Sequence, residues 1–117
     1  MTTLTGEMLD ALVIESQSLP AELLRAYRNP PGRKPTESAM RIRDALADTD
    51  DATALLLLRD VVDAAVFQMV YLLGAGFKSN LSVDISRDGN RERLHGSALH
   101  EEYRARVAPG GLPYRCT

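Results

Sequence analysis

The chain has 117 residues, of which 44% are hydrophobic, so it is long enough to bury one real core. Its formal net charge of −2 excludes a strong overall attraction to nucleic acid or to an anionic membrane surface. The single cysteine, Cys116, cannot form an internal disulfide, and we therefore expect a cytoplasmic protein.

The first segment of the chain predicts two short helices that meet at a proline. Thr5 is a suitable N-cap, and Glu7 follows in the first turn. Apolar residues then recur at helical spacing: Met8, Leu9, Leu12 and Val13. Pro20 breaks this helix or begins a second one over residues 21–27, because proline suits the first helical position. No base precedes Arg25, so we expect no signal peptide.

A rigid internal loop and a further helix follow. Residues 29–35 contain three prolines and a glycine, which exclude regular pairing. Thr36 can cap a helix that runs to about Ala47. The apolar stripe of this helix is Ala39, Ile42 and Leu46. The acids of residues 48–51 form a turn and favour the N-terminus of the next helix.

Residues 52–77 predict one long helix whose two halves differ. In the first half, three charged residues span about 100° of the helix surface and form one polar stripe: Arg59, Asp60 and Asp63. Two turns later, the same stripe holds Phe67, Val70, Tyr71 and Gly74. A helix that is apolar on every side must be covered on every side. We therefore expect the second half to be covered by the chain's other elements or by a second molecule.

This helix supplies the interface candidates of the chain. They are Phe67, Val70, Tyr71, Gln68, Arg59, Asp60 and Asp63. Gln68 lies roughly opposite the polar stripe, and its amide would need a hydrogen-bond partner if it were buried, which makes it a candidate polar anchor. The uncharged run from residue 64 to residue 77 has 14 residues, fewer than the roughly 20 that a membrane span needs. We expect the helix to end at residues 74–76, where glycine permits a left-handed exit.

After the central helix the apolar period changes from 3.6 to 2 over residues 81–86, which predicts a half-buried strand in a hairpin. If residues 89–90 form the loop, Ile85 faces Leu94; a loop one residue earlier makes Val83 face Leu94. We prefer the first register because it has more favourable cross-strand pairs, each worth roughly 0.2–1 kcal/mol, and matches a glycine-first turn.

Ser97 is expected to cap a last helix, which carries the apolar residues Leu99, Tyr103 and Val107. For residues 109–117 the sequence is compatible with either a loose tail or a short additional strand. A lone two-stranded hairpin is marginal in water, so it must pack on the helices. Its open edges could also pair with the tail or with another subunit.

Charge is distributed in blocks along the chain. Residues 25–43 hold a basic block with one acid, Glu37. The bases of this block are Arg25, Arg28, Arg33, Lys34, Arg41 and Arg43. Residues 44–63 reverse the sign. Alternating blocks are typical of neighbouring helices that complement one another, but the basic block is also a candidate surface for a phosphate-bearing partner.

No motif supplies a convincing catalytic or metal site. Residues 76–79 resemble the end of a phosphate loop, but Tyr71 stands where that loop needs its first glycine. His95 and His100 could contribute to a zinc or acid–base site only if further ligands were assumed. Cys116 has no motif that would activate its thiol. We therefore assign no catalytic residue, no metal ligand and no cofactor.

The sequence predicts a single α+β domain over residues 1–117 that is mostly helical. N-terminal helices and a long central helix pack with a C-terminal two-stranded antiparallel hairpin and a final helix. We interpret the chain as a small non-catalytic protein-interaction or regulatory domain that self-associates, with a dimer favoured. It could bind another protein as an inhibitor or immunity-type binder does. The alternatives are a nucleic-acid or phosphate-binding regulator that uses residues 25–43 and, more remotely, a metal-dependent enzyme at His95 and His100.

Overall fold

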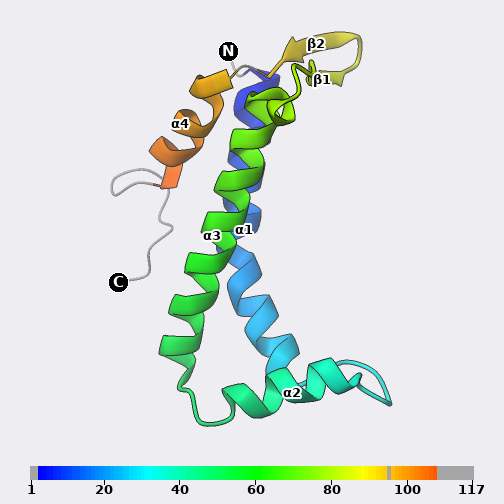
Figure 1. The fold of residues 1–117 in the computed structure, drawn as a ribbon, viewed down its shortest axis with the longest axis vertical. Coiled ribbons are helices and arrows are strands. Elements are labelled where there is room, and N and C mark those ends of the chain that lie inside the picture. Colours follow the sequence, from blue (N-terminus) through cyan, green and yellow to red (C-terminus); the bar gives the residue numbers. More distant parts are fainter. Residues whose placement is uncertain (1–2, 95, 108–117) are drawn as a thin grey trace. The chain divides into compact units, whose positions relative to one another are not determined.

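The chain folds into an α+β arrangement that is mostly helical, as the sequence predicts (Figure 1). The computed structural model describes residues 3–94 and 96–107, without the side chains of residues 96–98. Its helices are α1 (Leu4–Arg28), α2 (Glu37–Leu46), α3 (Asp51–Gly74), the short 3-10 helix η1 (Gly76–Lys78) and α4 (Gly96–Val107). Its strands are β1 (Asp84–Arg87) and β2 (Asn90–Arg93), which form an antiparallel hairpin.

The chain divides into two compact units, and the boundaries fall inside both long helices. Unit 1 comprises Met1–Glu15 and Ala64–Thr117, and unit 2 comprises Ser16–Asp63. Each unit therefore contains part of α1 and part of α3, while the hairpin and α4 belong to unit 1 and α2 belongs to unit 2.

Unit 1 contains a well-packed apolar core. Its buried members come from α1, α3, α4 and the residue after β2: Leu9, Val13, Val70, Leu94, Leu99, Tyr103 and Val107. The predicted stripe of the last helix is confirmed, since Leu99 and Tyr103 are at most 1% exposed. Half-buried Val83 and Ile85 pack against the same core from the hairpin side. Burial of a side chain of this size stabilises the fold by about 1.5–3 kcal/mol.

The hairpin adopts the alternative register, so the preferred one was wrong. Ile85 pairs with Glu92, and the amide of Leu94 donates to the carbonyl of Val83 at 2.8 Å. The loop residues Asp88 and Gly89 both have positive φ, 51° and 83°, which is the type I′ geometry that matches strand twist. Turn geometry and burial of Leu94 therefore outweigh the small cross-strand charge pairs that favoured the other register.

Polar contacts fasten the hairpin to the start of α1. The carboxylate of Glu92 accepts hydrogen bonds from the amides of Leu4 and Thr5, at 2.8 and 2.9 Å, and from the Thr5 hydroxyl at 2.8 Å. These bonds, with those from the Thr5 and Leu4 amides the strongest, lower the pKa of Glu92. The predicted role of Thr5 as N-cap is thus wrong, because Glu92 accepts from the first amides of the helix and Thr5 lies within it.

Helix α1 continues through Pro20, so the expected break there was wrong. The side chain of Pro20 is almost fully buried. An interior proline costs about 3 kcal/mol because it removes one backbone hydrogen bond and crowds the preceding turn. Burial offsets part of that cost. In a regular helix the amide of residue 20 would donate to the carbonyl of Ser16, and proline has no amide hydrogen to donate. Ser16 is also the first residue of unit 2.

Unit 2 owes much of its local structure to caps and one arginine. Thr36 caps α2 as predicted, accepting from the Ala39 amide at 3.1 Å. Asp50 caps α3 through the amide and hydroxyl of Thr53, and these bonds lower the pKa of Asp50. Arg28, at the end of α1, donates to the backbone carbonyls of residues 46 and 49 at 2.9 and 2.6 Å. It also contacts the Asp51 carboxylate at 2.9 Å.

The end of α3 requires glycine, as the sequence predicts. The helix stops at Gly74, and Gly76 has a φ of 60°. A Cβ atom at Gly76 would lie 2.3 Å from the carbonyl oxygen of Leu81, so no other residue fits without a backbone shift.

Candidate protein-interaction site

The apolar second half of α3 is covered mainly within unit 1. Val70 is fully buried in the core and offers no surface to a partner. Phe67 and Tyr71 are half-buried, with their rings 5.6 and 5.3 Å from the ring of His100 in edge-to-face contacts. The Arg104 guanidinium lies 4.1 Å from the Phe67 ring centre. These aromatic side chains therefore serve the packing of α3 on α4.

Gln68 and the polar stripe of α3 retain contact with solvent. Gln68 is exposed, so it is not a polar anchor in the core. Asp60 is also exposed, whereas Arg59 and Asp63 are half-buried. Of the predicted interface candidates, Gln68 and Asp60 are thus the two that the fold presents most openly.

The first half of α3 exposes large apolar side chains that the sequence analysis did not single out. Leu56, Leu57 and Val61 are 68%, 58% and 54% exposed. We call these three residues the exposed α3 set. Leu57 and Val61 are four residues apart and therefore adjacent on the helix surface. The sequence signal for this exposure is the run Leu55–Leu58 (LLLL). It places leucines around the whole helix, and one neighbouring helix cannot cover all of them.

Helix α2 is amphipathic, yet none of its residues is buried. Ala39 and Leu46, from its apolar stripe, are half-buried, and Ile42 is 38% exposed. The stripe that the sequence predicts is therefore real but incompletely covered. Helix α2 and the first half of α3 both belong to unit 2, while unit 1 also exposes large apolar side chains on its helices, at Ile14 and Met69.

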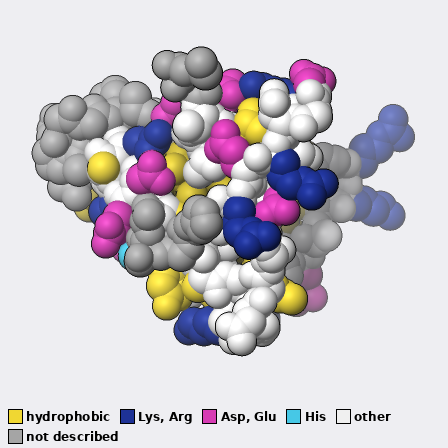
Figure 2. Space-filling view, turned by 90° about the horizontal axis from the view of Figure 1, so that it is seen from above, with side chains coloured by type: hydrophobic (Ala, Val, Ile, Leu, Met, Phe, Trp, Pro, Cys, Tyr) yellow, Lys and Arg dark blue, Asp and Glu magenta, His cyan; other side chains and the backbone are white. Residues whose placement is uncertain are grey.

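The basic block does not act as one patch. Arg28 is turned into unit 2 by its contacts with the α2–α3 turn. Arg43 forms a weak surface ion pair with Asp44 at 3.4 Å. The remaining bases are exposed: Arg25, Arg33, Lys34 and Arg41. Figure 2 shows one face of the molecule, seen from above relative to Figure 1, on which basic and acidic side chains are interspersed.

Of the two histidines that the sequence offers for a metal or acid–base site, the structure describes His100. His100 packs between aromatic rings, and its Nδ1 atom is buried without a hydrogen-bond partner. No group of three or more His, Cys, Asp or Glu side chains in the described residues could hold a metal ion. His95, Cys116, the Ser97 cap and the predicted tail at 109–117 lie outside the described side chains.

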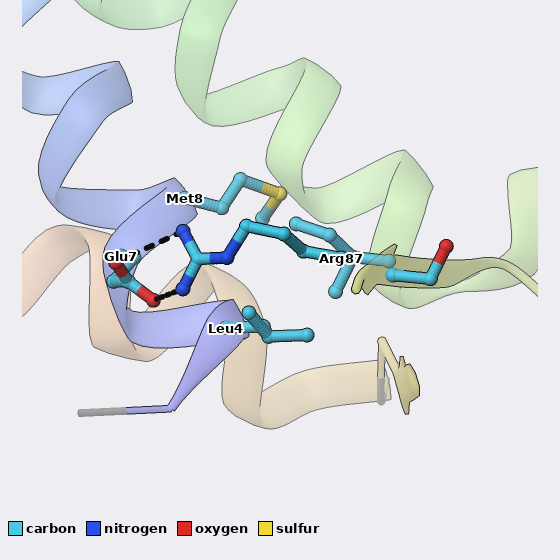
Figure 3. Close-up of a pocket in the computed structure, with 6 residues that line it drawn as sticks. Leu4, Glu7, Met8 and Arg87 are labelled. Atoms are coloured by element: carbon cyan, nitrogen blue, oxygen red, sulfur yellow. Dashed lines mark hydrogen bonds and ion pairs between the residues drawn. The ribbon is translucent and has the colours of Figure 1, made fainter. Parts of the chain in front are cut away.

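Unit 1 also contains a pocket of about 360 Å³ between the start of α1 and β1 (Figure 3). Leu4, Met8 and Ile85 supply its apolar lining. Arg87 spans it to Glu7 with two hydrogen bonds, at 2.7 and 3.2 Å, and these bonds raise the pKa of Arg87. Because the guanidinium is already paired, the pocket presents no free charged group to a ligand.

No helix within the described residues is both long and apolar enough to cross a membrane. The chain matches no model of a protein family, no curated protein and no solved structure. Its surfaces are therefore the basis for any functional proposal.

Proposed function

We propose that this chain is a non-catalytic protein-binding domain that self-associates through unit 2. The exposed α3 set carries the proposal, since three large aliphatic side chains on one helix are each more than half exposed. Isolated apolar side chains are common on protein surfaces, but grouped ones are typical of interaction sites. The uncovered stripe of α2 gives the same unit a second surface of this kind.

The proposed partner is a second copy of the chain. A symmetric contact would bury each member of the exposed α3 set twice, once in each copy. Removing a leucine or valine side chain fully from water is worth about 1.5–3 kcal/mol. Doubling that gain is the simplest way for so small a surface to offset the entropy lost on association. We further propose that the protein acts in the cytoplasm, supported by its single cysteine.

Light scattering tests this function directly. The wild-type protein at tens of micromolar should have a mass above that of the 12.8 kDa monomer. Leu57→Glu should reduce self-association, because it places a charge in the apolar contact. Ile14→Glu is the matched control, since Ile14 is 59% exposed against 58% for Leu57 but belongs to unit 1. A monomeric mass over the whole concentration range would refute self-association.

A second candidate function is binding of a polyanion such as nucleic acid. Four exposed bases favour it: Arg25, Arg33, Lys34 and Arg41. Such binding predicts retention on heparin that weakens steeply with salt. Passage through heparin without retention at low salt would eliminate this candidate and leave the first untouched.

A further inference from the structure

Helix α2 lacks the cover that a helix of its length needs. It has ten residues, and none of them is buried. A helix this short is marginal in water even with good helix-forming residues, so its stability comes from packing. Its own unit covers Ala39 and Leu46 only partly and leaves Ile42 at 38% exposure. The apolar stripe of α2 is therefore only partly covered within its own unit.

The exposed charges around α2 are segregated along its axis. Arg33 and Lys34 precede the helix, and Asp44 and Asp48 stand at its end and beyond it; all four are exposed. Three charges on the helix depart from this order: Glu37 in the first turn and Arg43 in the last, where each complements the helix dipole, and the exposed Arg41 near the middle. The neighbouring acids Asp50 and Asp51 are already engaged by Thr53 and Arg28. Asp44 is itself paired with Arg43 at 3.4 Å, so the basic end consists of Arg33 and Lys34 and the acidic end rests on Asp48.

We propose that α2 is the centre of the self-association surface and packs antiparallel against α2 of a second copy. In that arrangement Ile42 lies near the two-fold axis, with the apolar stripes facing one another. Arg33 and Lys34 then approach Asp48 of the other copy, and the same contact recurs at the opposite end. The two helix dipoles are also antiparallel, which is the favourable orientation.

A second copy suits this face because one chain carries both complementary ends. A two-fold contact repeats each favourable charge pair and closes on itself, so that the assembly stops at a dimer. A parallel arrangement would place base against base and acid against acid, which is costly at a contact. The inference rests on the self-association proposed above and adds which helix meets which, and in what direction.

A charge-swap experiment tests the antiparallel arrangement. The first variant carries Arg33→Glu and Lys34→Glu, and the second carries Asp44→Lys and Asp48→Lys. Each alone brings like charges together at both ends and should self-associate at least about tenfold more weakly than wild type. Their equimolar mixture should restore association as a one-to-one heterodimer, because both ends are complementary again. Sedimentation velocity and energy transfer between labelled variants give the readouts.

A second test uses Ile42, at the centre of the proposed contact between the two α2 helices, which we call the α2 seam. Ile42→Glu should weaken self-association, whereas Leu19→Glu should not, because Leu19 is 39% exposed in the same unit but lies on α1. Circular dichroism of each variant checks that the helices remain folded.

The outcomes separate this inference from the proposed function. The α2 seam is overturned, and self-association is not, if the wild type is a dimer and the charge variants associate as strongly as it does. The same conclusion follows if the mixed variants associate no more strongly than each variant alone. A wild-type monomer overturns both. A mixture that recovers the wild-type mass, together with loss of association in Ile42→Glu, supports the seam.

Discussion

The two units of this chain are stabilised by different kinds of contact. Unit 1 buries a continuous apolar core that includes Leu9, Val70 and Tyr103, each essentially without solvent exposure. Unit 2 contains α2, of which no residue is buried, and half of α3, where large apolar side chains remain exposed. It also buries Leu24, Ala54 and Val62, and the Thr36 cap and the hydrogen bonds of Arg28 hold its helix ends.

This difference supports placing the proposed self-association in unit 2. A region rich in buried contacts opens only with global unfolding, whereas a region held by exposed hydrogen bonds opens locally at lower free energy. Apolar surface that is left uncovered in such a region can be covered by a partner. The contrast thus favours unit 1 as the structural base and unit 2 as the binding half.

The largest expected effect comes from the core of unit 1. Leu9→Ala should lower the free energy of unfolding by about 2–5 kcal/mol, because it leaves a cavity in a packed site. Ile14→Ala, on the same helix and in the same unit but 59% exposed, should change it by less than about 0.5 kcal/mol. Urea denaturation measures both. Equal effects would mean that unit 1 has no such core.

The next effect concerns Arg28 in unit 2. Arg28→Ala should cost about 1–3 kcal/mol, because the carbonyls of residues 46 and 49 lose their charged donor. The ion pair with Asp51 adds little, since that carboxylate side chain is 75% exposed. Hydrogen exchange should show the loss in unit 2. Arg25→Ala, an exposed arginine on the same helix, is the control, and an equal response from it would exclude the specific role of Arg28.

A smaller effect should appear at the start of α2. Thr36→Ala removes the side chain that accepts from the Ala39 amide and should weaken α2 by about 1 kcal/mol. Because α2 has no buried residue, the loss should be local and visible as faster amide exchange in residues 37–46. Ser38→Ala should not accelerate exchange, since alanine is the better helix former there. Unchanged exchange in Thr36→Ala would show that packing, not the cap, holds α2.

The smallest effect is a change of pH dependence in unit 1. The pKa of Glu92 is lowered from its ordinary value of 4.5 by hydrogen bonds from the start of α1. Its contribution to stability is therefore complete above pH 4.5 and is lost as the pH falls below that value. Glu92→Gln should make the acid decline of stability shallower. Glu101→Gln, exposed on α4, should keep the wild-type decline; identical curves for Glu92→Gln and wild type would contradict this role.

Features that depend on a few adjacent residues could be predicted from the sequence. The Thr36 cap, the glycine exit of α3 and the apolar stripe of α4 are confirmed because each follows from local spacing. The continuity of α1 through Pro20 could not be predicted, since the burial of Pro20, which offsets part of the cost of an interior proline, depends on the tertiary structure. The role of Glu92 at the start of α1 was missed for the same reason, because 87 residues separate it from Thr5.

The sequence by itself determined α2, α3, the hairpin, α4 and their order, because periodicity, caps and glycines act within a few turns of chain, but it divided α1 at Pro20, where the structure has one helix. It also identified the central helix as a segment with more apolar surface than one side can cover. Only the tertiary structure decided which half of that helix is covered: α1 and α4 bury Val70, whereas Leu57 and Val61 stay exposed. The hairpin register was likewise decided in three dimensions, where the turn and the burial of Leu94 outweighed small charge pairs.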